Sequence, residues 1–439
     1  MTPSVSATSH DARPDSSHLP RNTELGELPW NWDIAPLFKN WDVLDCKHVT
    51  AKFVFSGWPV ASIRELQSRF VDLSEAKQTT DAFYRLLVDG GRRPQPGDLI
   101  VSRNATVGEV AQVAAWHPPF AMGQDVCLLR KRSQEHSTDY LQSLFHSRTI
   151  VRQLENLMTG STFRRVNVKQ VKGLFIPIPP PEEQRAIAAA LSDVDELIGA
   201  LDRLIAKKRA IKLATMQQLL TGRKRLPGFT GEWREWRLID LFAGKKEYFD
   251  DGDWIESEYI TSTGIRLIQT GNIGEGCFLD KENKKYISED SCQLLRCKEV
   301  QVGDLLICRL AEPAGRACIV PDIGEARMIT AVDVTICRPV EADADYLVQL
   351  FSTSWWFEQV DLRCGGTTRS RIARGQLARI EVHLPPMKEQ NAIAAVLRDM
   401  DGEIAALEQR RDKTIAIKQG MMQQLLTGRI RLVPMETDT

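Results

Sequence analysis

The sequence predicts an α+β protein in which two mixed domains alternate with two long helices. Three observations support this prediction. The chain repeats itself at a fixed offset, the best-matched part of each repeat carries helical heptad spacing, and the remainder alternates short apolar runs with turn signals. With 43% hydrophobic and 26% charged residues, the chain has the composition of a globular protein. Its 439 residues are too many for one hydrophobic core and indicate more than one domain.

The repeat is a tandem duplication in which Pro179 matches Pro385. Between residues 179–226 and 385–432, roughly 28 of 48 positions are identical without a gap. Weaker matches lie upstream, for example GDLIVSR at 97–103 with GDLLICR at 303–309. The divergent parts and the tails give six predicted segments: a disordered N-terminal tail (1–27), a first globular domain (28–178), a first helix (179–225), a second globular domain (226–384), a second helix (385–432) and a C-terminal tail (433–439).

Each matched segment predicts a helix of about 40 residues, close to 60 Å long. Pro181 suits the first helical position, and Gly222 and Gly428 suit the left-handed stop after the last turn. The first segment carries apolar residues at alternating spacings of four and three: Ile187, Leu191, Val194, Ile198, Leu201 and Ile205. An ordinary buried helix is the alternative. If the two helices pair along their length, the connectivity makes them an antiparallel coiled coil that relates the domains by a pseudo-twofold axis.

Composition and missing motifs argue against several classes of protein. The formal net charge of −1 argues against a histone-like coat, and the nine cysteines form no CxxC pair. No phosphate-binding GxxxxGK[ST] loop and no methyltransferase signature is found, while PDIGEAR at 321–327 only faintly resembles a nuclease core. We find no signal peptide and no apolar run long enough for a bilayer, so we expect a cytoplasmic protein that binds no metal and lies in no membrane.

Polar and basic loops recur in both halves and are candidates for contacts with nucleic acid. Arginine can hold phosphate or the guanine edge, and amide or hydroxyl groups can read adenine or phosphate. A solvated charged loop is the alternative interpretation for the loops, and a structural role is the alternative for the two arginines that end strands, Arg103 and Arg309. The candidate residues are Ser161, Thr162, Arg164, Arg165 and Lys169 in the first loop; Thr367, Thr368, Arg369, Arg371 and Arg374 in its counterpart; Gln269, Thr270 and Asn272 in LIQTGNI; and the strand-end residues Arg103 and Arg309. The first domain lacks an LIQTGNI string, which leaves its base-reading loop unplaced.

The two copies of QQLLTGR, the paired PPPEEQRAIAAAL and PPMKEQNAIAAVL segments, and LPGFTGEW at 226–233 carry a resemblance that covers residues 28 to 432. The chain resembles the specificity (S) subunit of type I restriction–modification systems. This resemblance implies two target recognition domains that read a bipartite sequence in double-stranded DNA. It also implies spacer helices that dock two methyltransferase (M) subunits, and translocase–nuclease (R) subunits in the full complex. S-adenosylmethionine, ATP and Mg are then expected on the partners, with no cofactor on this chain.

Two other functions stay open from the sequence alone. One is a DNA-acting enzyme with its own nuclease or methyltransferase activity, and the other is a coiled-coil scaffold without DNA specificity. Neither the DNA sequence that is recognised nor the gap between its halves follows from these residues, because loop conformation and DNA shape contribute to recognition.

Overall fold

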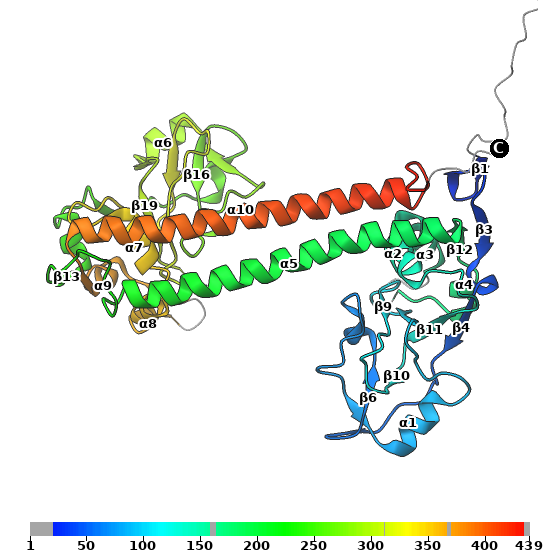
Figure 1. Ribbon diagram of the computed structural model, residues 1–439. Coiled ribbons are helices and arrows are strands. Elements are labelled where there is room, and N and C mark those ends of the chain that lie inside the picture. Colours follow the sequence, from blue (N-terminus) through cyan, green and yellow to red (C-terminus); the bar gives the residue numbers. More distant parts are fainter. Residues whose placement is uncertain (1–20, 159–163, 311, 367–369, 434–439) are drawn as a thin grey trace, which may run out of the picture. The chain divides into compact units, whose positions relative to one another are not determined.

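The computed structural model describes residues 21–158, 164–310, 312–366 and 370–433 (Figure 1). The chain forms two compact units. Unit 1 contains residues 1–201 and 410–439, and unit 2 contains residues 202–409. The two long helices, α5 (Pro181–Leu219) and α10 (Met387–Leu425), therefore each begin in one unit and end in the other.

Unit 1 contains two four-stranded sheets. The first has the order β4-β11-β8-β9 and is antiparallel throughout, and the second has the order β10-β6-β7-β5 with one parallel pair, β10 and β6. Its strands are β3 (Asp33–Pro36), β4 (Trp41–Asp45), β5 (Phe53–Val54), β6 (Trp58–Ala61), β7 (Gln78–Thr79), β8 (Leu99–Ser102), β9 (Val110–Gln112), β10 (Ala121–Met122), β11 (Val126–Lys131) and β12 (Phe175–Ile178). Its shorter helices are α1 (Asp81–Val88), α2 (Thr138–Phe145), α3 (Arg148–Leu157) and α4 (Val168–Lys172).

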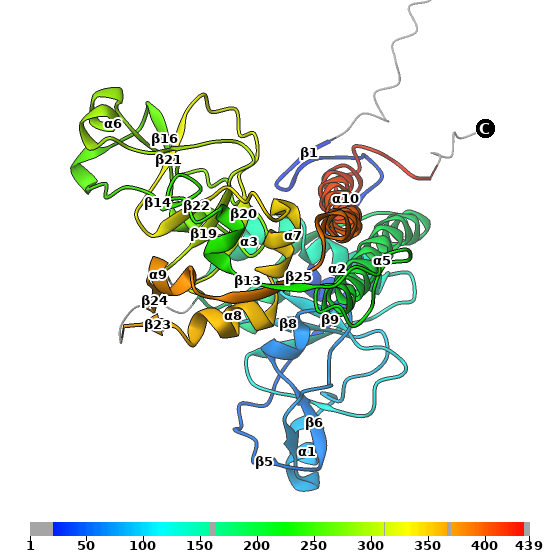
Figure 2. The ribbon, with the colours of Figure 1, turned by 90° about the vertical axis from the view of Figure 1, so that its left-hand side faces the viewer.

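Unit 2 repeats this plan, with sheets of order β14-β22-β19-β20 and β15-β17-β16-β21-β18. Figure 2 labels the strands of the first sheet, and β16 and β21 of the second. Its strands are β13 (Arg234–Arg237), β14 (Phe249–Asp251), β15 (Ile260–Thr261), β16 (Ile265–Ile268), β17 (Lys285–Ile287), β18 (Glu299–Val300), β19 (Leu305–Cys308), β20 (Ala317–Ile319), β21 (Met328–Thr330), β22 (Val334–Cys337), β23 (Cys364–Gly365), β24 (Arg371–Ile372) and β25 (Glu381–Leu384). Its shorter helices are α6 (Glu289–Leu295), α7 (Ala344–Leu350), α8 (Ser354–Asp361) and α9 (Arg374–Leu377).

The duplication read from the sequence recurs element by element in the fold. Strand β8 and strand β19 occupy matching positions, and so do α5 and α10, each of 39 residues. The parallel pair β10–β6 in unit 1 corresponds to the parallel pair β21–β16 in unit 2. The expectation of two mixed α+β domains and two long helices is therefore confirmed.

Within each unit, the start of one long helix packs beside the end of the other. In unit 1, Ile187 and Leu191 share a core with Leu425 and Leu426. In unit 2, Ile393 and Leu397 share a core with the final apolar residues of α5, namely Met216, Leu219 and Leu220. Each unit therefore completes its core with residues from both repeats.

A Glu-Gln pair in the first turn of each long helix ties these segments together. In unit 1, Glu183 is 1% exposed and accepts hydrogen bonds from the indole of Trp32 at 2.9 Å and from Arg431 at 2.6 Å. Gln184 bonds the backbone of Ser137 and Pro179. Arg431 belongs to the other repeat and follows Gly428, whose left-handed backbone conformation, with φ +67°, comes just after the end of α10.

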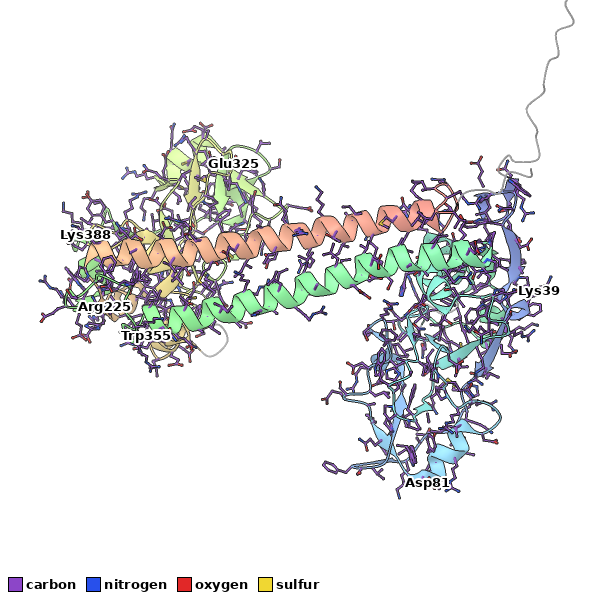
Figure 3. The ribbon with its side chains drawn as sticks, in the orientation of Figure 1. Lys39, Asp81, Arg225, Glu325, Trp355 and Lys388 are labelled. Carbon is purple, nitrogen blue, oxygen red and sulfur yellow. The ribbon has the colours of Figure 1, made fainter. Side chains whose placement is uncertain are left out.

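Unit 2 contains the same closing contact with the repeats exchanged. Glu389, in the first turn of α10, accepts two hydrogen bonds of 2.5 Å from Arg225, which follows the end of α5 and is labelled in Figure 3. Gln390 bonds Asp343 and Pro385, as its counterpart in unit 1 bonds Ser137 and Pro179. The repeated strings at the two ends of each long helix thus form one interaction in each unit.

The predicted N-terminal tail is too long. Residues 21–27 were assigned to it, yet β1 (Arg21–Thr23) and β2 (Gly26–Leu28) form a hairpin. Gly26 follows the turn with φ +102°, and the side chain of Leu28 is buried in the core of unit 1, with the partly buried Leu25 packed against it. Two apolar side chains in a polar segment give too weak a pattern to predict this hairpin from the sequence. Residues 1–20 and 434–439, the rest of the predicted tails, lie outside the described residues.

Candidate nucleic-acid interface

Each unit places a buried arginine at the end of a central strand. Arg103 follows β8 and is 2% exposed, and Arg309 follows β19 and is 3% exposed. Nη2 of Arg103 lies 2.7 Å from Asp45, and Nη2 of Arg309 lies 3.0 Å from Asp251. Because their side chains are buried and already paired with aspartates, both arginines have a structural role and are not available for DNA contacts.

These buried arginines also hold the predicted DNA-binding loops by their backbones. The amide of Val166 donates to the carbonyl of Arg103 at 3.0 Å, and the amide of Ile372 donates to the carbonyl of Arg309 at 3.0 Å. The residue just before each of these amides is an exposed arginine. Each predicted loop is therefore fastened to the sheet at its C-terminal end.

The exposed arginines each face an aspartate that immediately precedes a strand of the sheet, β11 in unit 1 and β22 in unit 2. Arg165 lies 3.7 Å from Asp125, and Arg371 lies 2.7 Å from Asp333. Both guanidinium groups remain about half exposed, at 51% and 46%. Surface pairs of this kind contribute little stability, so each arginine can exchange its aspartate for a phosphate or a base edge.

Unit 2 surrounds its loop with further charge. Arg374, at the start of α9, is paired with Asp250, which also lies 3.1 Å from Lys298. Burial alone raises the pKa of Asp250, but the hydrogen bonds from Lys298 and from the amide of Asp251 outweigh it, so its pKa lies below the usual value. Burial lowers the pKa of Arg309. Asp250 therefore stays ionised and keeps Arg374 and Lys298 in place.

The LIQTGNI segment presents only part of its polar face. Asn272 is 5% exposed; its Nδ2 donates to the carbonyl of Leu279 at 2.8 Å and its Oδ1 accepts from the amide of Gln269. This side chain is therefore committed to the turn and is not free to read a base, contrary to our expectation. Gln269 and Thr270 remain half-exposed and stay candidates.

Unit 1 has a counterpart to this segment that the sequence did not reveal. A turn of 3-10 helix at Ile63–Leu66 follows β6, as the turn at Thr270–Asn272 follows β16, and both begin with a reciprocal capping pair. In unit 1 the pair is Ser62 with the buried Glu65. The two segments have no similar sequence, and they correspond only because each follows the matching strand.

A further candidate in each unit is the short connection that precedes the matching strand, between β5 and β6 in unit 1, which lie on either side of β7, and between β15 and β16 in unit 2, which lie on either side of β17. In unit 1, β5 and β6 are joined through Phe55, whose side chain is fully exposed, and Lys77 lies over the neighbouring ring of Phe53 at 5.1 Å. Gly57 is required there, because a Cβ would stand 2.2 Å from the carbonyl oxygen of Thr79. Residues 261–264, of sequence TSTG, form the matching connection in unit 2. An exposed aromatic side chain can serve as a wedge or stacking group for DNA, and no motif in the sequence marks Phe55 for this role.

The remaining predicted contacts divide into two groups. Arg164 and Lys169 are exposed in unit 1, as expected of DNA contacts. Five others lie outside the described residues: Ser161, Thr162, Thr367, Thr368 and Arg369.

Two groups of residues that could suggest catalysis have structural roles in the described part of the chain. Oxygen, sulfur and nitrogen ligand atoms of Asp45, Cys46 and His48 lie within 4.8 Å of one another. The positive guanidinium of Arg103 lies 2.7 Å from Asp45, so its charge disfavours a metal cation at this group of residues. In PDIGEAR, Glu325 accepts from the hydroxyl of Tyr286 at 2.8 Å, so the acid of the nuclease-like string holds a loop.

Two repeated α+β units, each with an arginine-anchored loop at the edge of its sheet, define a two-domain DNA-recognition protein. The family model for the type I restriction modification DNA specificity domain matches residues 90–207 and 232–416. The chain therefore belongs to this family, and the resemblance drawn from its sequence is confirmed. As a specificity subunit, it recognises DNA and is not the catalytic component. The match in the first half begins at residue 90, so the β5–β6 connection that carries Phe55 lies outside it.

Individual relatives agree over most of the chain. A putative type I restriction enzyme MjaX specificity subunit from Methanocaldococcus jannaschii is 26% identical over 402 residues, covering 86% of this chain and 88% of that protein. The MjaVIII specificity subunit of the same organism is 26% identical over 295 residues, 64% of this chain and 67% of that protein.

Two solved structures share the fold. One comes from a study of complex assembly and conformational transition of the type I R-M system, with a TM-score of 0.56 and 18% identity, covering 92% of this chain and 99% of that one. The other is the type I restriction-modification S subunit from M. genitalium, with a TM-score of 0.56 and 14% identity, covering 90% and 96%.

In the described part of the chain, no helix combines the length and the apolar character that crossing a membrane requires.

Proposed function

We propose that each unit of this specificity subunit reads one half of a bipartite target in double-stranded DNA. The observation that supports this most strongly is the recurrence of one anchored loop in different surroundings. Arg165 and Arg371 occupy matching positions, while the connection before the matching strand carries the exposed Phe55 in one unit and a hydroxyl-rich TSTG in the other. Matching supports with different reading groups suit two different DNA words.

We further propose that α5 and α10 form an antiparallel coiled coil that sets the gap between the two words, with the units related by a pseudo-twofold axis. In unit 2, Lys208 lies 2.5 Å from Glu403 and Lys212 lies 2.5 Å from Asp401. In unit 1, Lys418 lies 2.6 Å from Asp195. These ion pairs join the two helices within each unit, and they support continuous pairing. Half-sites about one DNA turn apart, roughly 34 Å, fall within the reach of helices of about 60 Å.

The partners follow from the same assignment. Two methyltransferase subunits would dock on the repeated helical segments, and translocase–nuclease subunits would complete a restriction complex in the cytoplasm. S-adenosylmethionine, ATP and Mg belong to those subunits in this proposal, and this chain binds no cofactor. The repeated surface of the helices supports two copies of one partner.

A selection of bound DNA tests the reading of two words. The chain, purified with its methyltransferase subunits, is incubated with random double-stranded DNA, and the enriched sequences are determined. We expect a split motif from the wild-type chain. Arg165→Gln should blur one half of the motif only, and Arg371→Gln the other half only, because each removes a single guanidinium from one unit.

Arg85→Gln and Arg398→Gln serve as controls, because both side chains are exposed and paired with an acid away from the loops. Both controls should leave the motif intact. A single uninterrupted motif, or equal loss in both halves from either loop variant, contradicts the proposal. Absence of any motif favours a scaffold, and DNA cleavage or methylation by the chain alone favours an enzyme.

A further inference from the structure

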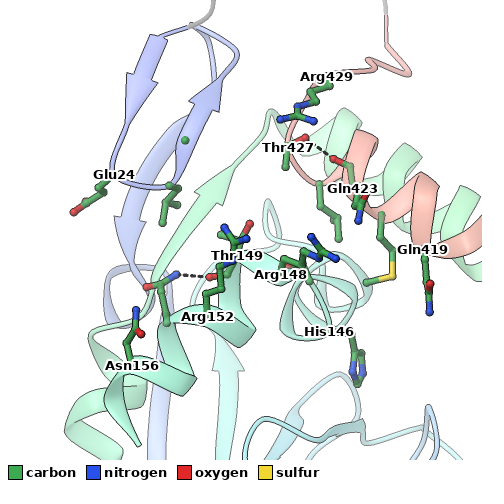
Figure 4. Close-up of a pocket in the computed structure, with 16 residues that line it drawn as sticks. Glu24, His146, Arg148, Thr149, Arg152, Asn156, Gln419, Gln423, Thr427 and Arg429 are labelled. Atoms are coloured by element: carbon green, nitrogen blue, oxygen red, sulfur yellow. Dashed lines mark hydrogen bonds between the residues drawn. The ribbon is translucent and has the colours of Figure 1, made fainter. Parts of the chain in front are cut away.

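A hollow of about 850 Å³ opens in unit 1 beside the end of α10, as Figure 4 shows. Three segments that are far apart in the sequence line it: the turn of the N-terminal hairpin at residues 24–26, the stretch 146–156 around α3, and residues 419–429 at the end of α10. None of the DNA-binding candidates described above lines this hollow.

The lining carries an excess of positive charge over an apolar floor. Arg148, Arg152 and Arg429 surround it, and in the described part of the chain none of the three makes an ion pair with a carboxylate. Glu24 is the acid among the lining residues, and Met422 with the buried Leu426 forms the floor. Because these cations are unpaired, the hollow suits a ligand that brings carboxylates and some apolar surface.

The matching place in unit 2 has different charge. Applying the repeat offset, Arg429 corresponds to Arg223, which is retained, but Arg148 corresponds to Ser354 and Arg152 to Glu358. The hollow beside the end of α5 measures about 550 Å³ and is lined by Ala214, Gln217, Gln218, Arg223 and Lys224, without any residue of α8. The ends of the two long helices are therefore repeated, whereas the arginines of α3 beside the end of α10 have no counterpart in α8.

We propose that the hollow in unit 1 binds an acidic segment of a protein partner, and that this contact forms once per chain. Arginines around an apolar centre are typical of protein interfaces, whereas interfaces with DNA are more uniformly polar and basic. The inference rests on the proposed function, because it adds one asymmetric contact to a subunit whose helices repeat. A partner that docks on both helix ends meets the arginines of α3 in unit 1 alone.

Photo-crosslinking at matched positions tests the proposal. The photoreactive amino acid p-benzoylphenylalanine replaces Gln423, which lines the hollow in unit 1, or Gln217, its counterpart in unit 2. Each variant is assembled with the methyltransferase subunits, then with the translocase–nuclease subunits, and irradiated. We expect a crosslink from position 423 to a Glu- and Asp-rich segment of one subunit, with about tenfold lower yield from position 217 to that segment.

Charge reversal gives the second arm of the test. Arg148→Glu with Arg152→Glu should lower the crosslink at 423 about tenfold, and Arg223→Glu, at the retained position in unit 2, should not change it. DNA selection with the same variants separates the two proposals, because the split motif should persist when the crosslink is lost. Equal crosslinking at both positions, crosslinking to DNA, or no crosslink at 423 in the complete complex each overturns the inference.

Discussion

Removing Arg431 should destabilise unit 1, although this residue lies near the far end of the chain. Its guanidinium pairs with Glu183, which is 1% exposed and whose other contact is the indole of Trp32. Arg431→Ala leaves this carboxylate buried with one donor. Breaking a buried pair in this way typically costs about 3–5 kcal/mol. Arg431 itself is 20% exposed, so water replaces part of its contact, and we expect about 3 kcal/mol, the lower end of that range.

Hydrogen exchange measured residue by residue is the suitable assay, because a chain with two units does not unfold in one step. Amides of β8 in unit 1 should exchange roughly a hundredfold faster in Arg431→Ala, since each 1.4 kcal/mol is a factor of about ten. Amides of β19 in unit 2 should be unchanged. Arg429→Ala is the matched control, two residues earlier and without an ion pair in the described structure.

A double variant separates the charge from the packing. Glu183→Gln combined with Arg431→Met removes both charges and keeps most of the volume, so it should recover much of the loss. If Arg431→Ala exchanges as slowly as Arg429→Ala, the buried pair does not close unit 1 and the reasoning fails.

Three further outcomes are expected. Gly264→Ala should loosen β15 and β16 by about 1–3 kcal/mol, because its Cβ would stand 2.3 Å from the carbonyl oxygen of Ile287 at φ +123°; exchange at Ile265 reports it, and Gly375→Ala, with open space around it, should be neutral. Phe55→Ala should leave the stability of unit 1 unchanged and weaken binding to one half-site by about tenfold, the size of one lost base contact; a stability loss without a binding loss would contradict this role. Burial raises the pKa of the Cys127 thiol to about 12, so iodoacetamide at pH 8 should modify exposed Cys277 long before Cys127, as peptide mass spectrometry can show.

The long helices could be predicted closely because their signals are local. Pro181 begins α5, and Gly222 and Gly428 follow the two helix ends in left-handed conformations, as the capping patterns indicate. Periodicity over many turns needs no knowledge of the tertiary fold. The duplicated architecture followed for the same reason, since closely matching strings in one chain imply matching folds.

The direction in which polar side chains point could not be predicted. Asn272 sits in a turn motif that suits base reading equally well, but its amide bonds Leu279 and Gln269 inside the unit. The position of Arg103 at the end of a strand fits a DNA contact and a structural role equally well. Its partner Asp45 lies on another strand, 58 positions away. Such partners are brought together by the tertiary fold, and a pattern of residue types along the chain does not contain that information.

The exchange of helix ends between the repeats also bears on synthesis of the protein. Domains commonly fold as they leave the ribosome, the N-terminal one first. Here unit 1 lacks Leu425, Leu426 and Arg431 until these residues are made, whereas residues 202–409 complete unit 2. At about 5–20 residues per second, the first unit waits on the order of 10–40 s for its closing segment. The unit that is translated first is thus the unit that completes its fold last. During that interval the apolar surface that will contact Leu425 and Leu426 is open to chaperones.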